Sequence, residues 1–384
     1  MVVATDNLPR YAEFFAGGGM VRAALKDHWQ CVMANDIDAM KCAVYARNWG
    51  DEALLHMDVR DLPSEPLLQA IDLYWASSPC QDFSLAGKGL GLKGQRSGVF
   101  HDWIAAIEPA IESGFAPRLI AFENVVGLLT RNAGRDFAHV CKTLMRMGYN
   151  VGAMEIDTRH FLPQSRPRLF VVAARNDLDI SGLAMEGPGV VFHTRKLTQF
   201  VSSAPRDIRN GWIWWSHGVP ADGGGALQDL VDGDPDTRWL GDAQVDALLS
   251  MMDPVNLEKV RAARGVNALR VGTLYKRGRP DAKGVVRQRA EVRFDGIAGC
   301  LRTPAGGSSR QTLFLVNGNE TRARLLSSRE TARLMGLPDS YVLPSRYTDA
   351  YRVTGDGVAV PIVAYLHETI FKKVLALKQK KNAA

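Results

Sequence analysis

The 384-residue chain carries 47 Lys and Arg residues against 41 Asp and Glu residues, a formal net charge of +6, and 46% of its residues are hydrophobic. This length predicts a large domain and a smaller one, and the mild positive charge permits a nucleic-acid partner without requiring one. No apolar run approaches the ~18 residues of a membrane span, and the amino-terminal stretch has no apolar signal core. The five scattered cysteines include no Cys-x-x-Cys pair, which indicates a reduced, cytoplasmic protein without a zinc site.

The first half of the chain alternates short apolar strands with helix-like stretches. Helical spacing of apolar residues is found at 20–29 and 101–113. Strands are predicted at residues 11–16, 31–36, 71–77, 118–124 and 168–174. Strands that alternate with helices are typical of an α/β fold with a doubly wound, mostly parallel sheet.

The pattern changes after about residue 180. Residues 259–293 hold eleven basic residues and two acidic ones, whereas residues 221–236 are rich in Gly and Asp and predict a loop. Regular structure returns with a helix at 327–336 and a final amphipathic helix at 362–379. The chain is therefore divided into a cofactor-binding catalytic domain at 1–184, a second domain at 185–344, and a return to the first at 345–384.

The stretch FFAGGGM at 14–20 follows a strand and opens a helix. Glycines there let the backbone approach a ligand closely, although an ordinary tight turn is the alternative. Asp36 ends the second strand, where an acid can accept hydrogen bonds from ribose hydroxyls, and Asp58 is suited to an adenine amino group. Because no Gly-Lys-Ser/Thr sequence is present to hold a triphosphate, the pattern favours S-adenosylmethionine.

Cys80 follows the strand at 71–77 and precedes a polar stretch rich in Gly, Lys, Ser and Arg. Glu123 ends the next strand, and Arg166 and Arg168 come just before another. The carboxyl edge of an open α/β sheet is where ligands bind, so a thiol, a carboxyl group and two guanidinium groups are predicted to meet there. The alternative is a surface Glu–Arg pair of little energetic value.

Six segments resemble, in order, the motifs of the DNA cytosine-C5 methyltransferase family in its bacterial or phage forms. They are FAGGGM, PCQDFS, ENV, QSRPR, RLLSSRETARLMGLPDSY (324–341) and GDGVAVPIV (355–363). The resemblance implies a Rossmann-like methyltransferase fold with an inserted target-recognition domain. Two positions depart from the family pattern: Met20 and Asp356 stand where glycine and asparagine are usual. We expect Met20 to enter the following helix without difficulty.

The resemblance implies covalent catalysis, in which the Cys80 thiolate adds to C6 of a cytosine flipped out of duplex DNA. Glu123 would hold or protonate N3. Arg168 would bind O2 and Arg166 would brace its loop, an order that the residues alone do not establish. The residues expected at the cofactor are Phe15, Ala16, Gly17, Gly19, Asp36, Ile37, Asp58, Val59, Pro79, Val99, Asp356 and Val358. No metal is expected.

The loop from Gln81 to Arg96 is expected to act as a lid over the flipped base, with Ser84, Lys88 and Arg96 on phosphates. In the second domain, Lys276 and Arg287 are expected on phosphates and Arg277 and Arg279 on base edges. The second-domain tryptophans are expected in its core rather than stacked on bases; they are Trp212, Trp214, Trp215 and Trp239.

The expected partner is double-stranded DNA, bound by a monomer in the cytoplasm or nucleoid without membrane contact. A cognate restriction endonuclease would act separately. Two alternatives stay open: a tRNA cytosine-5 methyltransferase of the same fold, and a catalytically inactive DNA-binding regulator. The large insert argues against the first, and the intact Cys80, Glu123 and Arg168 argue against the second.

Overall fold

The computed structural model describes residues 8–78, 98–220, 224–233, 235–266, 268–280, 284–302 and 309–378. The chain divides into two compact units. The first unit comprises 1–156, 167–219 and 360–384, and the second comprises 157–166 and 220–359. This division differs from the predicted boundaries, because residues 185–219 belong to the first unit and residues 345–359 to the second.

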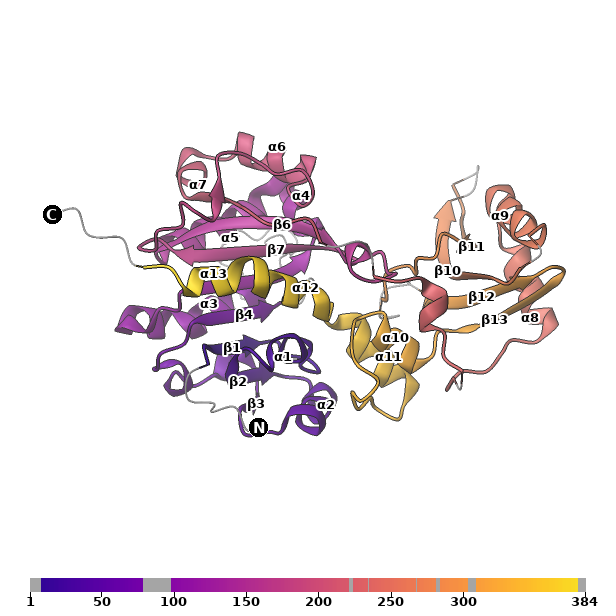
Figure 1. The fold of residues 1–384 in the computed structure, drawn as a ribbon, viewed down its shortest axis with the longest axis horizontal. Helices are drawn as coiled ribbons and strands as arrows, with labels where there is room; N and C mark the ends of the chain where they lie inside the picture. The colour runs from indigo at the N-terminus through magenta and orange to yellow at the C-terminus, as the bar shows by residue number, and fades with distance from the viewer. Residues whose placement is uncertain are drawn as a thin grey trace. The chain divides into compact units, whose positions relative to one another are not determined.

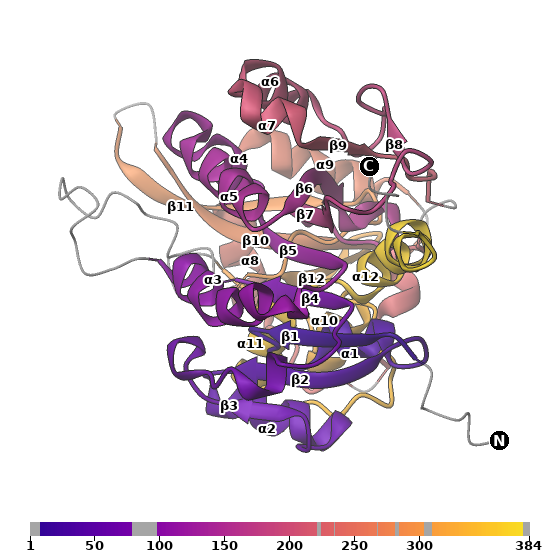
Figure 2. The ribbon, with the colours of Figure 1, turned by 90° about the vertical axis from the view of Figure 1, so that its left-hand side faces the viewer.

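The first unit is built on a nine-stranded sheet in the order β3-β2-β1-β4-β5-β7-β6-β9-β8 (Figures 1 and 2). Its strands are β1 (Arg10–Phe14), β2 (Gln30–Asp36), β3 (Leu54–His56), β4 (Leu73–Ser77), β5 (Leu119–Val125), β6 (Tyr149–Asp157), β7 (Pro167–Arg175), β8 (Ala184–Met185) and β9 (Trp212–Trp215). Strands β3, β2, β1, β4 and β5 pair in parallel, as do β6 and β9, whereas β7 is antiparallel to β5. The mostly parallel α/β sheet predicted from the sequence is confirmed.

Helices cover both faces of this sheet, with α3 and α5 on one side and α1 and α12 on the other (Figure 2). The helices of the first unit are α1 (Met20–Leu25), α2 (Ala39–Trp49), α3 (Val99–Ala110), α4 (Gly127–Thr130), α5 (Arg135–Arg146), α6 (Arg195–Ser203), α7 (Arg206–Asn210), α12 (Val360–Leu366) and α13 (Lys372–Leu375). Beneath α3, the Trp103 ring stacks on Phe122 and meets Phe14 edge-on. On the opposite face, Phe371 packs edge-on against Trp29 and Trp75.

Short helical turns link several of these elements. Those with 3-10 geometry are Val59–Asp61, Glu65–Leu67, Arg131–Gly134, Thr158–His160 and Leu227–Leu230, and those with π geometry are Ile111–Phe115 and His367–Phe371. In the described parts of the chain, no helix combines the length and apolar character that crossing a membrane requires.

The second unit has a four-stranded antiparallel sheet in the order β11-β10-β12-β13. Its elements are β10 (Arg270–Pro280), β11 (Val286–Arg293), β12 (Thr312–Asn317), β13 (Glu320–Leu325), α8 (Asp242–Ser250), α9 (Pro254–Arg264), α10 (Ser328–Arg333) and α11 (Tyr347–Asp356). Leu274 and Phe314 from the sheet are buried together with Val260 of α9. This small core is separate from that of the first unit.

The tryptophans were placed wrongly by the sequence. Trp215, on β9, is fully buried in the first unit, where its indole N–H donates to the Val172 carbonyl at 3.0 Å. Strand β9 extends the large sheet beside β6, so Trp212 and Trp214 belong to the first unit as well. Trp239 lies in the second unit but is 36% exposed, with the Arg322 guanidinium 4.1 Å above its ring.

Candidate active site

The glycine turn after β1 holds a strained backbone. Phe15, Gly17 and Gly19 all have positive φ angles, of 57°, 57° and 77°. A left-handed conformation costs a residue with a Cβ about 1–2 kcal/mol, and such strain concentrates at ligand sites. A Cβ on Gly19 would lie 2.4 Å from Nε1 of Trp49. Met20 is the buried first residue of α1, as expected, so its departure from the family pattern leaves the turn intact.

Asp36 ties this turn to the end of β2. Its Oδ2 accepts a hydrogen bond from the Gly17 N–H at 2.8 Å, and its Oδ1 accepts one from the Asp38 N–H at 2.8 Å. The neighbouring Ile37 side chain is 63% exposed. A fixed carboxylate beside an uncovered apolar side chain offers a polar contact and an apolar contact to the same ligand.

Asp58 has a partner that the sequence did not suggest. It caps the turn at Val59–Asp61, and its Oδ2 forms an ion pair with Nη2 of Arg60 at 2.6 Å. The Arg60 side chain, followed by the Arg60 backbone N–H, lowers the pKa of the Asp58 carboxyl. Val59 is buried, and Val99 begins α3.

Glu13, the fourth of the five residues of β1, was missed by sequence reasoning. Its side chain is 1% exposed, and burial raises the pKa of its carboxyl well above its usual range. The Asp36 charge acts in the same direction and the Arg22 charge opposes it. The signal was an acidic residue inside the apolar run YAEFFA, which places a buried carboxyl group one residue before the strand's last position.

Glu123 and Arg168 meet at the carboxyl end of β5. Arg168 stands opposite Val125 in the antiparallel β5–β7 pair and is therefore diagonal to Glu123 on one face of the sheet. Nε of Arg168 lies 3.2 Å from Oε1 of Glu123, and the two side chains are 17% and 9% exposed. The predicted carboxyl and guanidinium groups are thus brought together.

Asn124 connects this strand end to β4. Its amide nitrogen donates to the Ser78 carbonyl at 3.1 Å, and Ser77 of β4 is paired in register with Glu123. Ser78 is the last described residue before a gap in the description. Six residues with predicted roles lie outside the described residues: Pro79, Cys80, Gln81, Ser84, Lys88 and Arg96.

Arg166, in the second unit, binds backbone carbonyls. Its Nη1 donates to the Leu301 carbonyl at 3.0 Å, and its Nη2 donates to the carbonyls of Gly355 at 2.9 Å and Gly357 at 2.7 Å. The residue is 2% exposed. These contacts fix the backbone on both sides of Asp356, whose Oδ2 lies 3.9 Å from Nε of Arg352.

Gln164 is a second residue, after Glu13, to which the sequence analysis gave no role. The residue is fully buried, and its side-chain nitrogen donates to the Leu334 carbonyl at 2.6 Å. The segment 324–341 that contains Leu334 is joined by a buried pair, Arg324 with Glu330, at 2.6 and 2.8 Å. The Gln-Ser-Arg stretch and segment 324–341 therefore form one interlocked structure within the second unit.

The hairpin of β10 and β11 carries an unusual set of cross-strand pairs. Arg277 stands directly opposite Arg289, and Arg279 directly opposite Arg287. Residues that alternate along a strand share a face, so these four arginines lie on one face of the hairpin. Like charges directly opposite each other destabilise a strand pair. Arg279 is partly compensated by Glu291, 2.8 Å away.

One group of side chains has metal-ligand spacing among the described residues. The ligand atoms of His28, His367 and Glu368 lie within 4.8 Å of one another. However, the Trp29 indole N–H donates to Nδ1 of His367 at 3.0 Å, and Lys372 pairs with Glu368 at 3.1 Å. These partners use the same groups that a cation would need.

Three comparisons with known proteins bear on this geometry. A family model described as C-5 cytosine-specific DNA methylase matches residues 10–372. The type II methyltransferase M.HhaI of Haemophilus parahaemolyticus is 26% identical over 361 residues, 93% of this chain and 92% of that protein. M.Eco47II of Escherichia coli is 32% identical over 187 residues, 48% and 43% of the two chains. The S. pombe Dnmt2 methyltransferase structure covers 96% of this chain and is itself covered fully, with a TM-score of 0.59 and 18% identity, and supports the fold.

The family model extends from the first residue of β1 to beyond α12 and thus includes the glycine turn, the Glu123 edge and the whole second unit. The resemblance noted from the six sequence motifs is therefore confirmed. This chain belongs to the C-5 cytosine-specific DNA methylases, a family of S-adenosylmethionine-dependent enzymes, and is a DNA cytosine-5 methyltransferase.

Proposed function

We propose that this enzyme methylates a cytosine flipped out of double-stranded DNA at a defined sequence, with Cys80 as nucleophile and Glu123 as the acid. The observation that carries the proposal is the Glu123–Arg168 contact at the end of β5, beside Ser77 of β4. Cys80 follows Ser77 by three residues, and three residues of chain span at most roughly 10 Å. We therefore propose that Cys80 reaches the acid.

The chemistry requires both groups. Cytosine C5 is a poor nucleophile, and addition of the Cys80 thiolate to C6 gives C5 the character of an enamine carbon. Negative charge builds up on the ring as the C6–S bond forms, and Glu123 offsets it by a proton or hydrogen bond at N3. Bound S-adenosylmethionine supplies the methyl group that C5 accepts. Loss of the C5 proton then expels Cys80 and restores the ring.

The two arginines take different roles in this proposal. Nη1 and Nη2 of Arg166 already donate to backbone carbonyls at 2.7 to 3.0 Å, which supports a bracing role. Arg168 pairs with Glu123 through Nε, a contact that orients the carboxyl group. We therefore assign cytosine O2 to Arg168.

The cofactor would lie on the glycine turn of the first unit. Asp36, already fixed to the Gly17 N–H, would accept hydrogen bonds from the ribose hydroxyls, and the exposed Ile37 would cover the adenine. The adenine edge would meet Asp58 and Val59. Val99, the first residue of α3, would line the same pocket. Pro79, Asp356 and Val358 stay proposed cofactor contacts on the family pattern alone.

The arginine face of the β10–β11 hairpin supports DNA as the polyanion. Arg277 is paired with Arg289, and Arg279 with Arg287. These like-charge pairs destabilise the hairpin in the absence of DNA, and bound phosphates would remove the repulsion. Lys276 alternates with Arg277 along β10, so its side chain lies on the other face, and its backbone N–H donates to the Ser309 hydroxyl. We further propose that the enzyme acts as a cytoplasmic monomer without a metal, separately from any cognate restriction endonuclease.

Covalent trapping tests the assignment. Duplex DNA with 5-fluorocytosine blocks loss of the C5 substituent, so the C6–sulfur bond should persist in a denaturing gel. Cys80→Ala should abolish methylation and trapping while S-adenosylmethionine binding stays near the wild-type value. Cys31→Ser, which alters a half-buried thiol in β2, is the matched control and should still trap. A covalent adduct formed by Cys80→Ala would refute the nucleophile.

A further inference from the structure

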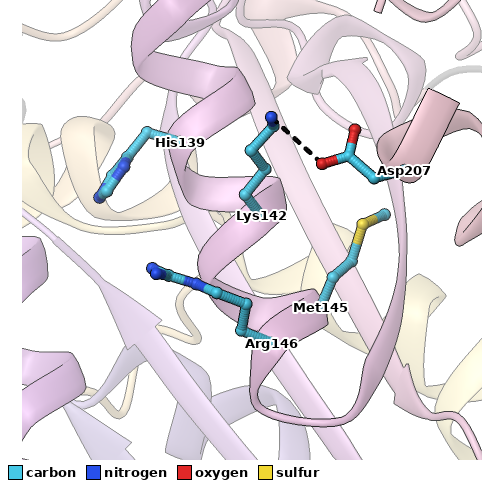
Figure 3. A pocket seen from close by; sticks show the side chains of 5 residues that line it. All are labelled: His139, Lys142, Met145, Arg146 and Asp207. Atoms are coloured by element: carbon cyan, nitrogen blue, oxygen red, sulfur yellow. Dashed lines mark ion pairs between the residues drawn. The ribbon is translucent and has the colours of Figure 1, made fainter. Parts of the chain in front are cut away.

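A pocket of about 360 Å³ lies beside α5 and α7 of the first unit (Figure 3). Four of its lining residues come from α5 and one from α7. They are His139, Lys142, Met145, Arg146 and Asp207. A volume of this size falls in the range of small-molecule sites.

The Arg146 end of this pocket lies away from the predicted chemistry. Arg146 ends α5, just before the chain turns into β6 at Tyr149, whose hydroxyl donates to the Pro117 carbonyl at 2.8 Å. Pro117 precedes the first residue of β5, whereas Glu123 stands near its other end. The length of β5, roughly 20 Å, therefore separates the two edges of the sheet. The other end of the pocket is nearer to Glu123, because the His139 ring lies 6.4 Å from that of Phe100, which packs edge-on against Phe122.

The charges in the lining favour an anion. Lys142 forms an ion pair with Asp207 at 3.1 Å, with side chains 43% and 59% exposed, and such a surface pair is worth little. Arg146 adds a second cation, with one of its guanidinium nitrogens on the Thr143 hydroxyl at 3.3 Å. Asp207 is the lining's one carboxylate, so Arg146 leaves a net positive charge at the pocket.

His139 gives the pocket a titratable wall. Its ring lies 4.7 Å from that of His101 on α3, tilted by 49°. Burial lowers the pKa of His139, the His101 and Arg146 charges lower it further, and Asp136 opposes them. An imidazole held neutral by neighbouring positive charge gains a proton more easily when an anion binds beside it.

We propose that the pocket binds a phosphomonoester of nucleotide size. The phosphate would lie beside the Arg146 guanidinium, which points to the same side of α5 as the His139 imidazole in Figure 3, with that imidazole donating to it. The Met145 thioether provides an apolar, polarizable wall against which an aromatic ring packs well. The lining thus offers both a polar and an apolar contact to one ligand.

Calorimetry on the full chain, saturated with S-adenosylhomocysteine to fill the cofactor site, tests this with guanosine 5′-monophosphate, guanosine and inorganic phosphate. The monophosphate should bind, guanosine should not, and phosphate should bind more weakly than the monophosphate. Arg146→Gln should weaken monophosphate binding about tenfold, as expected for one charged hydrogen bond. Arg135→Gln, at the opposite end of α5 and outside the pocket, is the matched control and should bind normally.

The pH dependence gives a second readout. Monophosphate affinity should rise more steeply in the wild type than in His139→Gln as the pH falls from about 8 to about 6, because a bound anion favours the imidazolium. Methylation activity verifies that each variant is folded, and Arg146→Met, which keeps the aliphatic stem of the side chain, replaces Arg146→Gln if that variant unfolds. Three outcomes would overturn the proposal. They are equal monophosphate affinities in all variants, guanosine binding as tight as that of its monophosphate, and displacement of the bound monophosphate by duplex DNA.

Discussion

The two units each contain an arginine–carboxylate pair, and the surroundings of the pairs differ. In the second unit, Glu330 receives both Arg324 guanidinium nitrogens and also the N–H groups of Asp232 and Ser327, and the pair is 0% and 2% exposed. In the first unit, Nε of Arg168 lies 3.2 Å from Oε1 of Glu123, and the two side chains are 17% and 9% exposed. The enclosed pair stabilises the fold, whereas the more exposed pair at the end of β5 can be reached by a substrate.

The largest expected effect is on catalysis at Glu123. Glu123→Gln keeps the size of the side chain and removes the acid, so the methylation rate should fall about 10²- to 10⁴-fold, the usual contribution of general acid–base catalysis. Single-turnover methylation of duplex DNA measures the loss, and S-adenosylmethionine binding should stay at the wild-type value. A variant that methylates at the wild-type rate would remove Glu123 from the mechanism.

Stability should respond at the other pair. Glu330→Ala leaves the Arg324 guanidinium buried without its anion, which costs about 3–5 kcal/mol. Urea denaturation followed by fluorescence should show this loss, and Glu123→Gln, measured in parallel, should lose far less. If both variants unfold at the same urea concentration, the contrast between the two pairs is wrong.

Much of the first unit was predictable because its signals are local. Apolar strands ending in Asp36, Glu123 or a glycine turn are visible in sequence, and each was found at the expected sheet edge. The β9 tryptophans were misassigned because their partner, β6, lies far away in the chain and no periodicity marked either strand as its neighbour. Long-range pairing of this kind has no local signature.

The candidate site also has features that the sequence predicts and features that it does not. The residue types predicted that Glu123 and Arg168 would meet. Arg166 differs from Arg168 in its contacts to backbone carbonyls, and such contacts have no sequence signal. The Arg60 partner of Asp58 depends on a turn of three residues, and the arginine face of the hairpin depends on a strand register. These features follow from backbone geometry that composition and spacing do not determine.

Cofactor binding should show an intermediate effect. Asp36→Ala removes the carboxylate that fixes the Gly17 N–H and would hold the ribose, so S-adenosylmethionine affinity should fall roughly ten- to a hundredfold, or about 1.5–3 kcal/mol. Asp38→Ala is the matched control, because Asp38 caps α2 through the Lys41 N–H and its loss should affect stability alone. Calorimetry without DNA measures both. Equal affinities in the two variants would contradict the role given to Asp36.

The smallest effect is expected on the β10–β11 hairpin. It distinguishes DNA binding by the second unit from catalysis by the first. Arg289→Gln removes one member of the Arg277–Arg289 pair, so the second unit should gain about 0.2–1 kcal/mol of stability at low salt through relief of like-charge repulsion. The same change should weaken binding of all duplexes and reduce the salt slope by about one, as for the loss of one phosphate contact. Cofactor affinity without DNA should not change. Urea denaturation at two salt concentrations, with salt titrations of cognate and scrambled duplexes, measures both. A loss of stability together with unchanged DNA binding would make Arg289 a structural residue, and the DNA contact would then have to lie elsewhere in the second unit.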